Sequence, residues 1–435
     1  MRKMRRFAPA GLLFAAALVL LAGCSNVTTG VSHSGNTDGI FPDRIVVGAL
    51  VSETGPLPAD FAPVLAGATA YLDTVNAAGG VAGRKIDLAY SLDDQSSPSV
   101  DASQARTLVD QDHVFAVVAV ATPSFTGASY LASNDVPTFG LAVNAQWMDG
   151  PSLFGDNGSY IDFTAPRLQA VFLAEQHHVH AAAVIAYDVS QSQAGCQGVV
   201  TAFRRYHIPL AFEDLSVPAP ASDLHADVIR MKADRVDMVV SCMDLSGNVL
   251  LSQTMQQQRL TGVTQLWSDG YDESALTEYA AAMQGVYFTE PNVPFEVSRL
   301  FPGRYPGMDK FEAAMRRYQP STPLSEAALA GWTGADLFVT GLRAVGRDLS
   351  RSRLVAAINR ISSFTADQVL APVDWRTAHT STGPINCNSY IEVQGNRFVS
   401  VYGTDGSVFV CLPVPPPPGP PLRPLASLPA GVPPG

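Results

Sequence analysis

The sequence predicts an α/β fold with two lobes, each built on a doubly wound parallel sheet, joined by a multi-strand hinge. Apolar, β-rich runs alternate with longer stretches of helical periodicity, which is typical of βαβ units. The strand-like runs are almost continuously apolar, as expected when helices cover both faces of a sheet. About nine such runs are too many for one compact sheet, and 435 residues leave room for two or three domains of roughly 150 residues.

The predicted elements follow one another from residue 45 onward. Helical spacing of apolar residues predicts a helix over 62–78 that ends at Gly79 and Gly80, and a second helix over roughly 100–111. Two further helical segments span 309–319 and 325–359, and three strand-like runs near the C-terminus cover 389–394, 398–403 and 407–411. The parallel strands are expected at 45–52, 85–92, 114–121, 136–143, 181–188, 236–243, 264–269 and 285–291.

We place the division between the lobes near Phe163. Residues 44–163 and 292–385 are expected to form the N-terminal lobe, and 164–291 with 386–412 the C-terminal lobe, so that the chain crosses the hinge several times. Residues 413–435 are rich in proline, which has no amide donor for helices or sheets, and are expected to be a disordered, extended tail.

The N-terminus carries the pattern of an export signal. Four cations in the first six residues precede the apolar run 7–22, which is too short for a permanent membrane helix. The segment Leu21-Ala22-Gly23-Cys24 resembles the lipobox of bacterial lipoproteins, which implies cleavage after residue 23 and a lipid anchor on Cys24. An ordinary secretory signal is the alternative. Residues 24–43 are rich in Ser, Thr, Asn and Gly and are expected to be a flexible tether.

Charge and composition exclude several classes of protein. The chain has 28 Lys and Arg against 39 Asp and Glu, a net charge of −11, which disfavours nucleic acid as a partner. Charged residues make up 15% and hydrophobic residues 47%, so most of the chain folds.

Four cysteines remain after Cys24, an even number that an oxidising compartment would pair. We prefer Cys387 with Cys411, because strand-like runs bring these residues close, and Cys196 with Cys242 by elimination. A zinc site is the alternative, but no CxxC or CxxH spacing supports it, and we expect no metal and no cofactor.

Two stretches carry a resemblance to a known family. Residues 48–98 contain a TGP turn after the first strand, the helix exit AGGVAGRKI and the pair DD after the second strand, and residues 325–346 form a long helix-like segment. In this order they resemble the type I periplasmic solute-binding proteins, close to the Leu/Ile/Val (branched-chain amino-acid) binding proteins of ABC transporters. The resemblance covers about 44–412 and implies the two-lobed fold above.

The resemblance also implies a ligand site between the lobes. Ligands of parallel sheets bind beyond the carboxyl ends of the strands, where an amino acid would need donors for its carboxylate and an acid for its ammonium group. Matching the family pattern puts Thr122 and Asn144 at hydroxyl positions, Ala142 at a backbone carbonyl position and Asp269 at the position of an ammonium-binding Glu. Ser124 lies beside Thr122 and is included in the expected site.

The chain departs from the family at the aromatic walls of this site. Asp60 with Phe61 beside it, Ser192 or Gln193, and Leu245 stand where the family usually has aromatic residues, so the pocket is expected to be larger or more polar. Side chains of these types after strands also serve simply as helix N-caps, which is the alternative for each of them. The cluster His177-His178-Val179-His180 is expected to lie on the surface.

The expected function is binding and not catalysis. The chain contains no GxSxG, HExxH, P-loop or GxGxxG motif, so none of these sequence motifs supports an enzymatic function. We expect a monomeric, lipid-anchored receptor on the extracytoplasmic face of the cell membrane that captures a small, amino-acid-like solute for an ABC permease and its ATPase. The alternatives are a ligand-sensing component of a membrane receptor and a surface scaffold that has lost its ligand.

Overall fold

The structure is a computed structural model, and it describes residues 37–56, 58–162, 165–383, 385–403, 407–414 and 421–425. The predicted signal peptide, Cys24 and the first part of the tether lie outside the described residues. In the part of the chain that the structure describes, no helix is both long enough and apolar enough to span a membrane.

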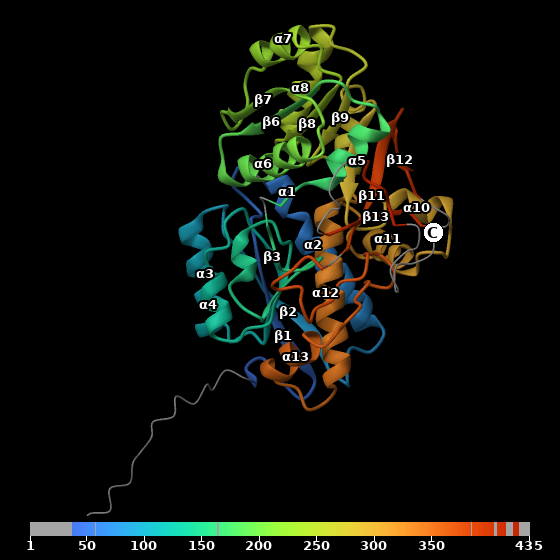
Figure 1. Ribbon diagram of the computed structural model, residues 1–435. Coiled ribbons are helices and arrows are strands. Elements are labelled where there is room, and N and C mark those ends of the chain that lie inside the picture. The colour runs from blue at the N-terminus through green and yellow to red at the C-terminus, as the bar shows by residue number, and fades with distance from the viewer. Residues whose placement is uncertain are drawn as a thin grey trace, which may run out of the picture. The chain divides into compact units, whose positions relative to one another are not determined.

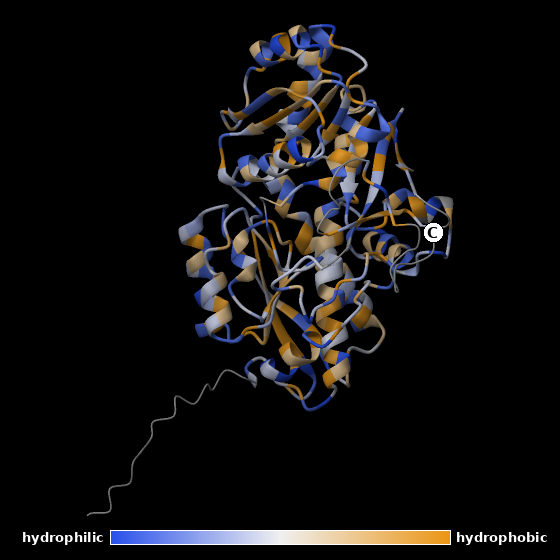
Figure 2. Cartoon of the chain, in the orientation of Figure 1, coloured by the Kyte–Doolittle hydropathy of each residue, from blue (hydrophilic) through white to orange (hydrophobic). Residues whose placement is uncertain are grey.

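The first sheet has five parallel strands in the order β2-β1-β3-β4-β5 (Figure 1). β1 and β3 are buried along almost their whole length and carry mainly hydrophobic residues (Figure 2). We call this sheet with its helices the N-terminal lobe. The strands are β1 (Arg44–Val51), β2 (Lys85–Asp93), β3 (Ala116–Ala121), β4 (Thr138–Gly140) and β5 (Leu153–Gly155).

The second sheet has eight strands and defines the C-terminal lobe. Its path is β12-β11-β10-β9-β8-β6-β7, and β13 pairs with β11 outside this path. The strands from β7 to β10 are parallel, whereas β11 runs antiparallel to β10, β12 and β13. The strands are β6 (Ala182–Tyr187), β7 (Leu210–Val217), β8 (Met238–Cys242), β9 (Thr264–Trp267), β10 (Val286–Glu290), β11 (Ile385–Gln394), β12 (Arg397–Val401) and β13 (Phe409–Pro413).

Helices connect the strands as expected for βαβ units. The helices of the first half are α1 (Pro58–Phe61), α2 (Pro63–Ala77), α3 (Pro98–Asp110), α4 (Ala128–Ser133), the 3-10 helix η2 (Ala145–Met148), α5 (Leu168–Gln176) and α6 (Ser190–Arg205). Those of the second half are α7 (His225–Ala233), α8 (Leu245–Gln257), α9 (Glu273–Tyr279), α10 (Phe295–Leu300), α11 (Pro306–Tyr318), α12 (Glu326–Val345) and α13 (Arg351–Ile358).

A late helix completes the N-terminal lobe. α12 packs against α2, β3 and β4, although it follows the parallel strands of the C-terminal lobe in the chain. The two helices meet at glycines: a Cβ on Gly67 would lie 1.7 Å from the carbonyl oxygen of Ala328, and one on Gly331 would lie 1.9 Å from that of Val64. This close approach requires glycine at both positions.

The structure differs from the expected elements in three places. The helical segment 325–359 is two helices, because Gly346 has φ +72° and ends α12. β5 and β7 are strands that the apolar-run pattern did not predict. In the C-terminal segment, Leu422 is buried against the C-terminal lobe, its amide donates to Glu175 at 2.8 Å, and the Leu425 amide donates to the Cys411 carbonyl at 3.0 Å. The expectation of a disordered tail therefore does not hold for residues 421–425.

Two disulfides connect elements of the C-terminal lobe. Cys196 in α6 pairs with Cys242 at the end of β8, and Cys387 in β11 pairs with Cys411 in β13. These are the two pairs that we preferred from the sequence. Because Cys387 and Cys411 are also direct partners in the antiparallel register, this disulfide ties together strands that already pair.

Candidate functional site

Six carboxyl groups lie where strands end and helices begin, and they come from both lobes. Asp60 is in α1, Asp156 directly follows β5, and Glu326 is the first residue of α12. The other three, Asp244, Asp269 and Glu290, belong to loops and a strand end of the C-terminal lobe. We call this set the acidic cluster. It is composed of Asp60, Asp156, Asp244, Asp269, Glu290 and Glu326.

The strand register brings Asp269 and Glu290 to the same level of the sheet. β9 and β10 are parallel, with Gln265 opposite Val286 and Leu266 opposite Tyr287. Continuing this register places Asp269, just beyond β9, beside Glu290 at the end of β10. Both carboxyls therefore stand at the carboxyl edge of the sheet, where parallel α/β sheets bind ligands.

Backbone and side-chain donors hold the Asp269 loop in place. The amide of Leu245 donates to Oδ2 of Asp269 at 2.9 Å, and Nδ2 of Asn248 donates to the Asp269 carbonyl at 3.1 Å. Asp244, the N-cap of α8, accepts from the Gly247 amide at 2.9 Å and from the Tyr187 hydroxyl at 2.6 Å. The start of α8 thus positions two members of the acidic cluster.

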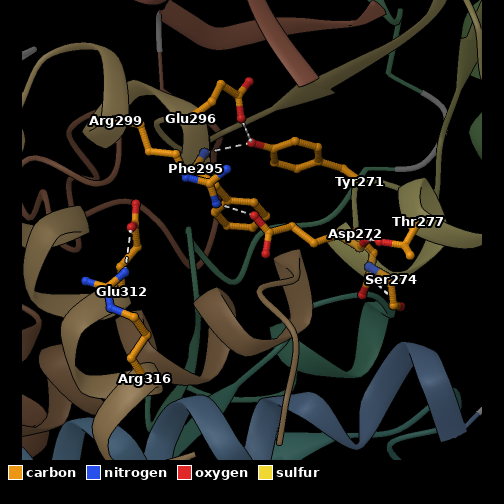
Figure 3. A network of polar contacts seen from close by, with 10 residues as sticks. Tyr271, Asp272, Ser274, Thr277, Phe295, Glu296, Arg299, Glu312 and Arg316 are labelled. Carbon is orange, nitrogen blue, oxygen red and sulfur yellow. Dashed lines mark hydrogen bonds and ion pairs between the residues drawn. The ribbon is translucent and has the colours of Figure 1, made fainter. Parts of the chain in front are cut away.

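A polar network anchors the other side of the same loop (Figure 3). The ring of Tyr271 stacks on Phe295 with centroids 4.6 Å apart, and its hydroxyl donates to Glu296 at 3.0 Å and accepts from the Phe295 amide at 2.7 Å. Asp272 caps α9 and forms an antiparallel bridge with Ser325. The loop that carries Asp269 is therefore joined to the start of α12, which carries Glu326.

Asp156 and Glu326 are positioned by local structure of the N-terminal lobe. The amide of Ala142 donates to Oδ1 of Asp156 at 3.0 Å. Ser325 is the N-cap of α12 and accepts from the Ala328 amide at 3.2 Å, which fixes the helix start and with it Glu326. A pocket of about 310 Å³ is lined by other residues, among them Asn157 and Pro291, which follow Asp156 and Glu290 in the chain.

Burial raises the pKa values of Asp60, Asp156, Asp269 and Glu326, and nearby carboxyls add to this rise for Asp60, Asp269 and Glu326. The pKa of Asp60 is raised to about 7, mainly by burial and to a smaller extent by the charges of Asp269 and Asp244. The pKa of Glu326 is also raised to about 7, mainly by burial and to a smaller extent by the charges of Asp269 and Asp156. For Asp156 and Asp269, burial raises the pKa to about 6 even though backbone amides favour the charged form.

Glu290 is the most perturbed member of the acidic cluster. Its side chain is 5% exposed, and burial together with Glu326, Asp269 and Asp156 holds its pKa well above the ordinary value. A side-chain hydrogen bond between Glu290 and Glu326 raises the pKa of Glu290 and lowers that of Glu326. After burial, other carboxyls are the strongest influence on the pKa values of Asp60, Glu290 and Glu326.

The hydroxyl and amide residues expected from the sequence lie together but bond to one another. Thr122 follows β3, is 2% exposed, and accepts from the Ser124 amide at 3.2 Å. Asn144, also 2% exposed, donates to the Thr122 carbonyl at 3.2 Å. At Ala142 we expected the backbone carbonyl to bind the ligand. The contact in the structure is instead a hydrogen bond from the Ala142 amide to Asp156. The polar groups of these residues therefore form hydrogen bonds within the loops of the N-terminal lobe.

Two expected wall residues have structural contacts. The Ser192 hydroxyl accepts from the Tyr187 amide at 2.8 Å and donates to the Cys242 carbonyl at 2.5 Å, which joins the ends of β6 and β8. Phe61 is 6% exposed and belongs to the largest hydrophobic core. Asp60 and Asp269 are the expected site residues that the structure brings together.

Sequence reasoning missed Asp156, Glu290 and Glu326. Glu290 could have been found, because it is an acid at the end of an apolar strand run, as Asp269 is. Glu326 looks like an ordinary first-turn acid of a helix, and Asp156 follows a strand of only three residues. Their proximity depends on contacts between the lobes, which no local pattern records.

Metal-binding residues do not gather in the described part of the chain: no group of three His, Cys, Asp or Glu there could hold an ion. Of the expected surface histidines, His177 packs beside Tyr287 and Tyr402 and bonds to the Tyr402 hydroxyl at 3.0 Å, and His180 is exposed beside Asp237.

Comparisons with known proteins agree with this architecture. The family model described as "Periplasmic binding protein" matches residues 44–396. A fatty acid ABC transporter substrate-binding protein from Thermomonospora curvata is similar in structure, with a TM-score of 0.68, 16% identity and coverage of 84% of this chain and 92% of that one. None of the curated proteins gives a significant match to this sequence.

Two further similar structures contain bound ligands. A solute-binding protein of an ABC transporter from R. palustris in complex with benzoate has a TM-score of 0.66, 17% identity and coverage of 82% and 95%. A branched-chain amino acid transporter substrate-binding protein from Streptococcus pneumoniae in complex with isoleucine has a TM-score of 0.65, 17% identity and coverage of 82% and 100%. At these identities the likeness shows the fold.

Proposed function

Because the chain belongs to the periplasmic binding protein family, whose model matches residues 44–396, we propose that it captures a small polar, amino-acid-like solute between its two lobes and delivers it to an ABC importer. The protein binds and does not catalyse: it holds the solute by hinge closure, and the closed form docks on the permease. The partners are then a permease and its ATPase.

The observation that carries this proposal is the interaction of carboxyls across the two lobes. The charges of Asp269 and Asp244 in the C-terminal lobe raise the pKa of Asp60 in the N-terminal lobe, and Glu326 forms a side-chain hydrogen bond with Glu290. Buried carboxyls that face one another destabilise a folded protein, since each ionised group raises the cost of ionising the next. Groups perturbed in this way cluster at functional sites. Polar groups that converge from both lobes are what a solute-binding cleft needs.

A direct contact between the lobes supports closure as the binding step. Nε2 of Gln191, at the start of α6, donates to the Pro123 carbonyl at 3.2 Å in the loop after β3. This loop also contains Thr122 and Ser124, so the contact lies beside the residues expected to bind the solute. In the open form we expect this bond to be absent.

The polar character of the cleft supports a polar solute. The similar structures named above hold isoleucine and benzoate, whereas carboxyls of both lobes gather near Asp60 in this chain. An amino-acid-like solute satisfies this environment through its ammonium group, for which Asp269 is the proposed partner.

Membrane attachment completes the proposal. Cleavage after residue 23 would leave Cys24 at the N-terminus, where a lipid on its thiol would hold the protein at the outer face of the membrane. The residues between Cys24 and β1 would act as a tether long enough for the lobes to contact a permease in the same membrane.

The experiment that tests the proposed function is a thermal-shift screen of the mature chain, followed by calorimetry of each positive compound. The screen should contain amino acids, amines, small carboxylates, sugars and purines. A solute at about 100 times its Kd stabilises the folded state by about 2.7 kcal/mol, which raises the midpoint of unfolding measurably. If no class of compound raises the midpoint and calorimetry detects no binding, the proposed function is wrong.

A further inference from the structure

One cavity lies where the chain passes from one lobe to the other. Within the described residues, the chain makes this passage three times: after β5, after β10 and before β11. The pocket of about 310 Å³ described above is lined from all three passages, and we call it the hinge pocket. Asn157 and Tyr160 come from the first passage, Pro291 from the second, and residues within 371–383 from the third.

Backbone hydrogen bonds tie the three passages together around the hinge pocket. The amides of Ser159 and Tyr160 both donate to the Ala378 carbonyl, at 2.9 and 2.8 Å, which joins the first passage to the third. The Ala371 amide donates to the Pro291 carbonyl at 3.4 Å, which joins the third passage to the second. The walls of the pocket are therefore linked, so that a movement of one passage displaces the others.

Two glycines in the lining connect the hinge pocket with lobe movement. Gly158 in the first passage has φ +120° and Gly383 in the third has φ +78°, and both residues line the pocket. Glycine changes its backbone angles at a low steric cost, and hinge closure is absorbed by a few loop residues that change these angles. We therefore expect the shape of the hinge pocket to change when the lobes rotate.

The lining of the hinge pocket is polar but carries no unpaired charge. Among the described lining residues, Asp374 alone is charged, and Arg376 binds its carboxylate through Nε at 2.8 Å and Nη2 at 2.6 Å. In the described part of the chain, the side chains of Asn157, Tyr160 and Thr382 have no hydrogen-bond partner. The other polar residues of the lining are Thr377, Ser381 and Asn386.

Hydroxyl groups complement a lining of this kind. A hydroxyl both donates and accepts, as do the hydroxyl and amide side chains of the pocket taken together. A charged ligand would lose its hydration here without meeting an unpaired opposite charge, which is costly. Pro291, Pro372 and Val373 belong to the same lining and offer apolar contacts to the carbon atoms of a ring or chain. The lining therefore favours a neutral compound with several hydroxyl groups.

The hinge pocket is separate from the site expected for the solute. Its described lining contains no member of the acidic cluster and none of the residues expected from the sequence to bind the solute. We propose that the hinge pocket binds a neutral polyhydroxyl compound, a sugar or a polyol, and that this binding is coupled to that of the solute. The coupling rests on the proposed function, because it takes lobe closure as the step that holds the solute.

The direction of the coupling follows from the arrangement in which the pocket is formed. The structure contains the bond between Gln191 and Pro123 across the lobes, which we expect only in the closed form. A compound that fits the pocket in this arrangement favours it over others, so it should strengthen solute binding. By reciprocity the solute strengthens binding in the hinge pocket by the same factor, which we expect to be about five or more.

Matched compounds test the chemistry of the hinge pocket. Glucose and myo-inositol are neutral, whereas at about pH 6.5 glucosamine is a cation and glucuronate an anion. Polyols at high concentration also stabilise proteins by exclusion from their surface, so binding to the mature chain is measured by calorimetry and ligand-observed NMR. The better neutral compound should have a Kd about tenfold or more below those of both charged ones. The ratio of the two neutral Kd values tells whether the pocket prefers a sugar or a polyol.

Variants locate the binding. Thr382→Val and Asn157→Leu each remove a polar group from the lining and should weaken the better neutral compound about fivefold. Both residues are exposed, so the variants should fold, which circular dichroism checks. Thr261→Val changes an exposed threonine outside the pocket and is the control with unchanged Kd. Asp269→Asn changes the cleft and should also leave this Kd unchanged.

Coupling is measured with the solute that the screen identifies. Calorimetry gives the Kd of this solute for the wild-type chain with and without a saturating concentration of the better neutral compound. The compound should lower the Kd of the solute about fivefold or more, and Thr382→Val should shift this effect to higher concentrations of the compound.

Each part of the proposal has a result that overturns it. If neither neutral compound binds, or if the charged compounds bind as tightly, the assigned chemistry is wrong, and the proposed function stands. If Thr382→Val and Asn157→Leu bind the neutral compound like the control, the compound binds elsewhere. An unchanged Kd of the solute would overturn the coupling. If no amino-acid-like solute binds while myo-inositol or glucose does, the proposed function fails and the hinge site remains.

Discussion

Glu290 and Glu326 belong to different lobes and are joined by a side-chain hydrogen bond. Glu290 ends β10 in the sheet of the C-terminal lobe, and Glu326 begins α12, which packs on the N-terminal lobe. The hydrogen bond between them raises the pKa of Glu290 and lowers that of Glu326. The boundary between the lobes is therefore sensitive to protonation, and this sensitivity leads to two of the following predictions.

The stability of the solute-free protein should fall as the pH rises from 6.5 to 8.5. Burial and like charges raise the pKa values of Asp60 and Glu326 to about 7, and that of Glu290 well above its ordinary value. Unfolded carboxyls titrate near pH 4, so the folded chain binds more protons in this range and loses free energy of unfolding as the pH rises.

Thermal unfolding at pH 6.5 and pH 8.5 measures this effect, and we expect a decrease of a few degrees in Tm. His379 has the opposite effect, because burial lowers its pKa to about 4 and the unfolded chain binds more protons above that value. Unfolded histidine is only half protonated at pH 6.5, so this opposing effect fades over the next pH unit and the carboxyls dominate the rest of the range. A Tm that is constant or rises across the range would contradict the prediction.

Glu326→Gln should stabilise the solute-free protein at pH 8 and weaken solute binding. The substitution keeps the size of the side chain but removes its charge. This ends the repulsion of Glu326 by Asp269 and Asp156 and its own repulsion of Glu290. We expect a gain of about 1 kcal/mol in the free energy of unfolding at pH 8 and a smaller gain at pH 5, measured by urea titration. Glu278→Gln is the control, and equal gains in the two variants would show that net charge alone is responsible.

Gly331→Ala should destabilise the N-terminal lobe, whereas Gly334→Ala should not. Both glycines lie in α12, but a Cβ at Gly331 would lie 1.9 Å from the Val64 carbonyl oxygen, while at Gly334 its nearest neighbour is 3.5 Å away. The first substitution forces α2 and α12 apart and should cost about 2 kcal/mol or more, whereas the second gains helix propensity. Urea unfolding of both variants checks the prediction, which fails if their midpoints move together.

Cys24→Ser should release the protein from the membrane without changing its solute affinity. The thiol of Cys24 is the proposed site of lipid attachment, and it precedes the first strand by a tether of about 20 residues. Fractionation of cells that express the wild type and the variant measures the membrane-bound share, and calorimetry of both proteins compares Kd. An unchanged membrane-bound share would show that attachment does not depend on this residue.

The sequence predicts the interior of the fold better than its edges. β1 and β3 are central strands, buried on both faces, so their residues form the continuous apolar runs that predict a parallel strand. β7 lies at the edge of its sheet with only Phe212 and Val217 buried, and β5 has only three residues. Neither pattern resembles the runs that identify the central strands.

The same contrast applies to the candidate site. Asp269 is predictable because parallel strands bind ligands beyond their carboxyl ends, and Asp269 comes directly after such a strand. Its neighbours Asp60 and Glu326 are far away in sequence, and their approach depends on how helices of one lobe meet loops of the other. The two disulfide pairs of the described residues were accessible to sequence reasoning because the strands around Cys387 and Cys411 already favour one of the three pairings.

The contact between Gly67 and Ala328 has a consequence for the order in which the chain folds. α2 comes early and α12 comes late, and the whole parallel part of the C-terminal sheet lies between them in the sequence. A chain that emerges N-terminus first from an export channel begins the N-terminal lobe early and cannot complete it until α12 has passed through. The C-terminal lobe has its strands β6 to β10 available before then, so the lobe that starts first is completed later. Such a long delay between contacting segments is typical of slow folding, and it leaves the exposed face of α2 in need of protection during export.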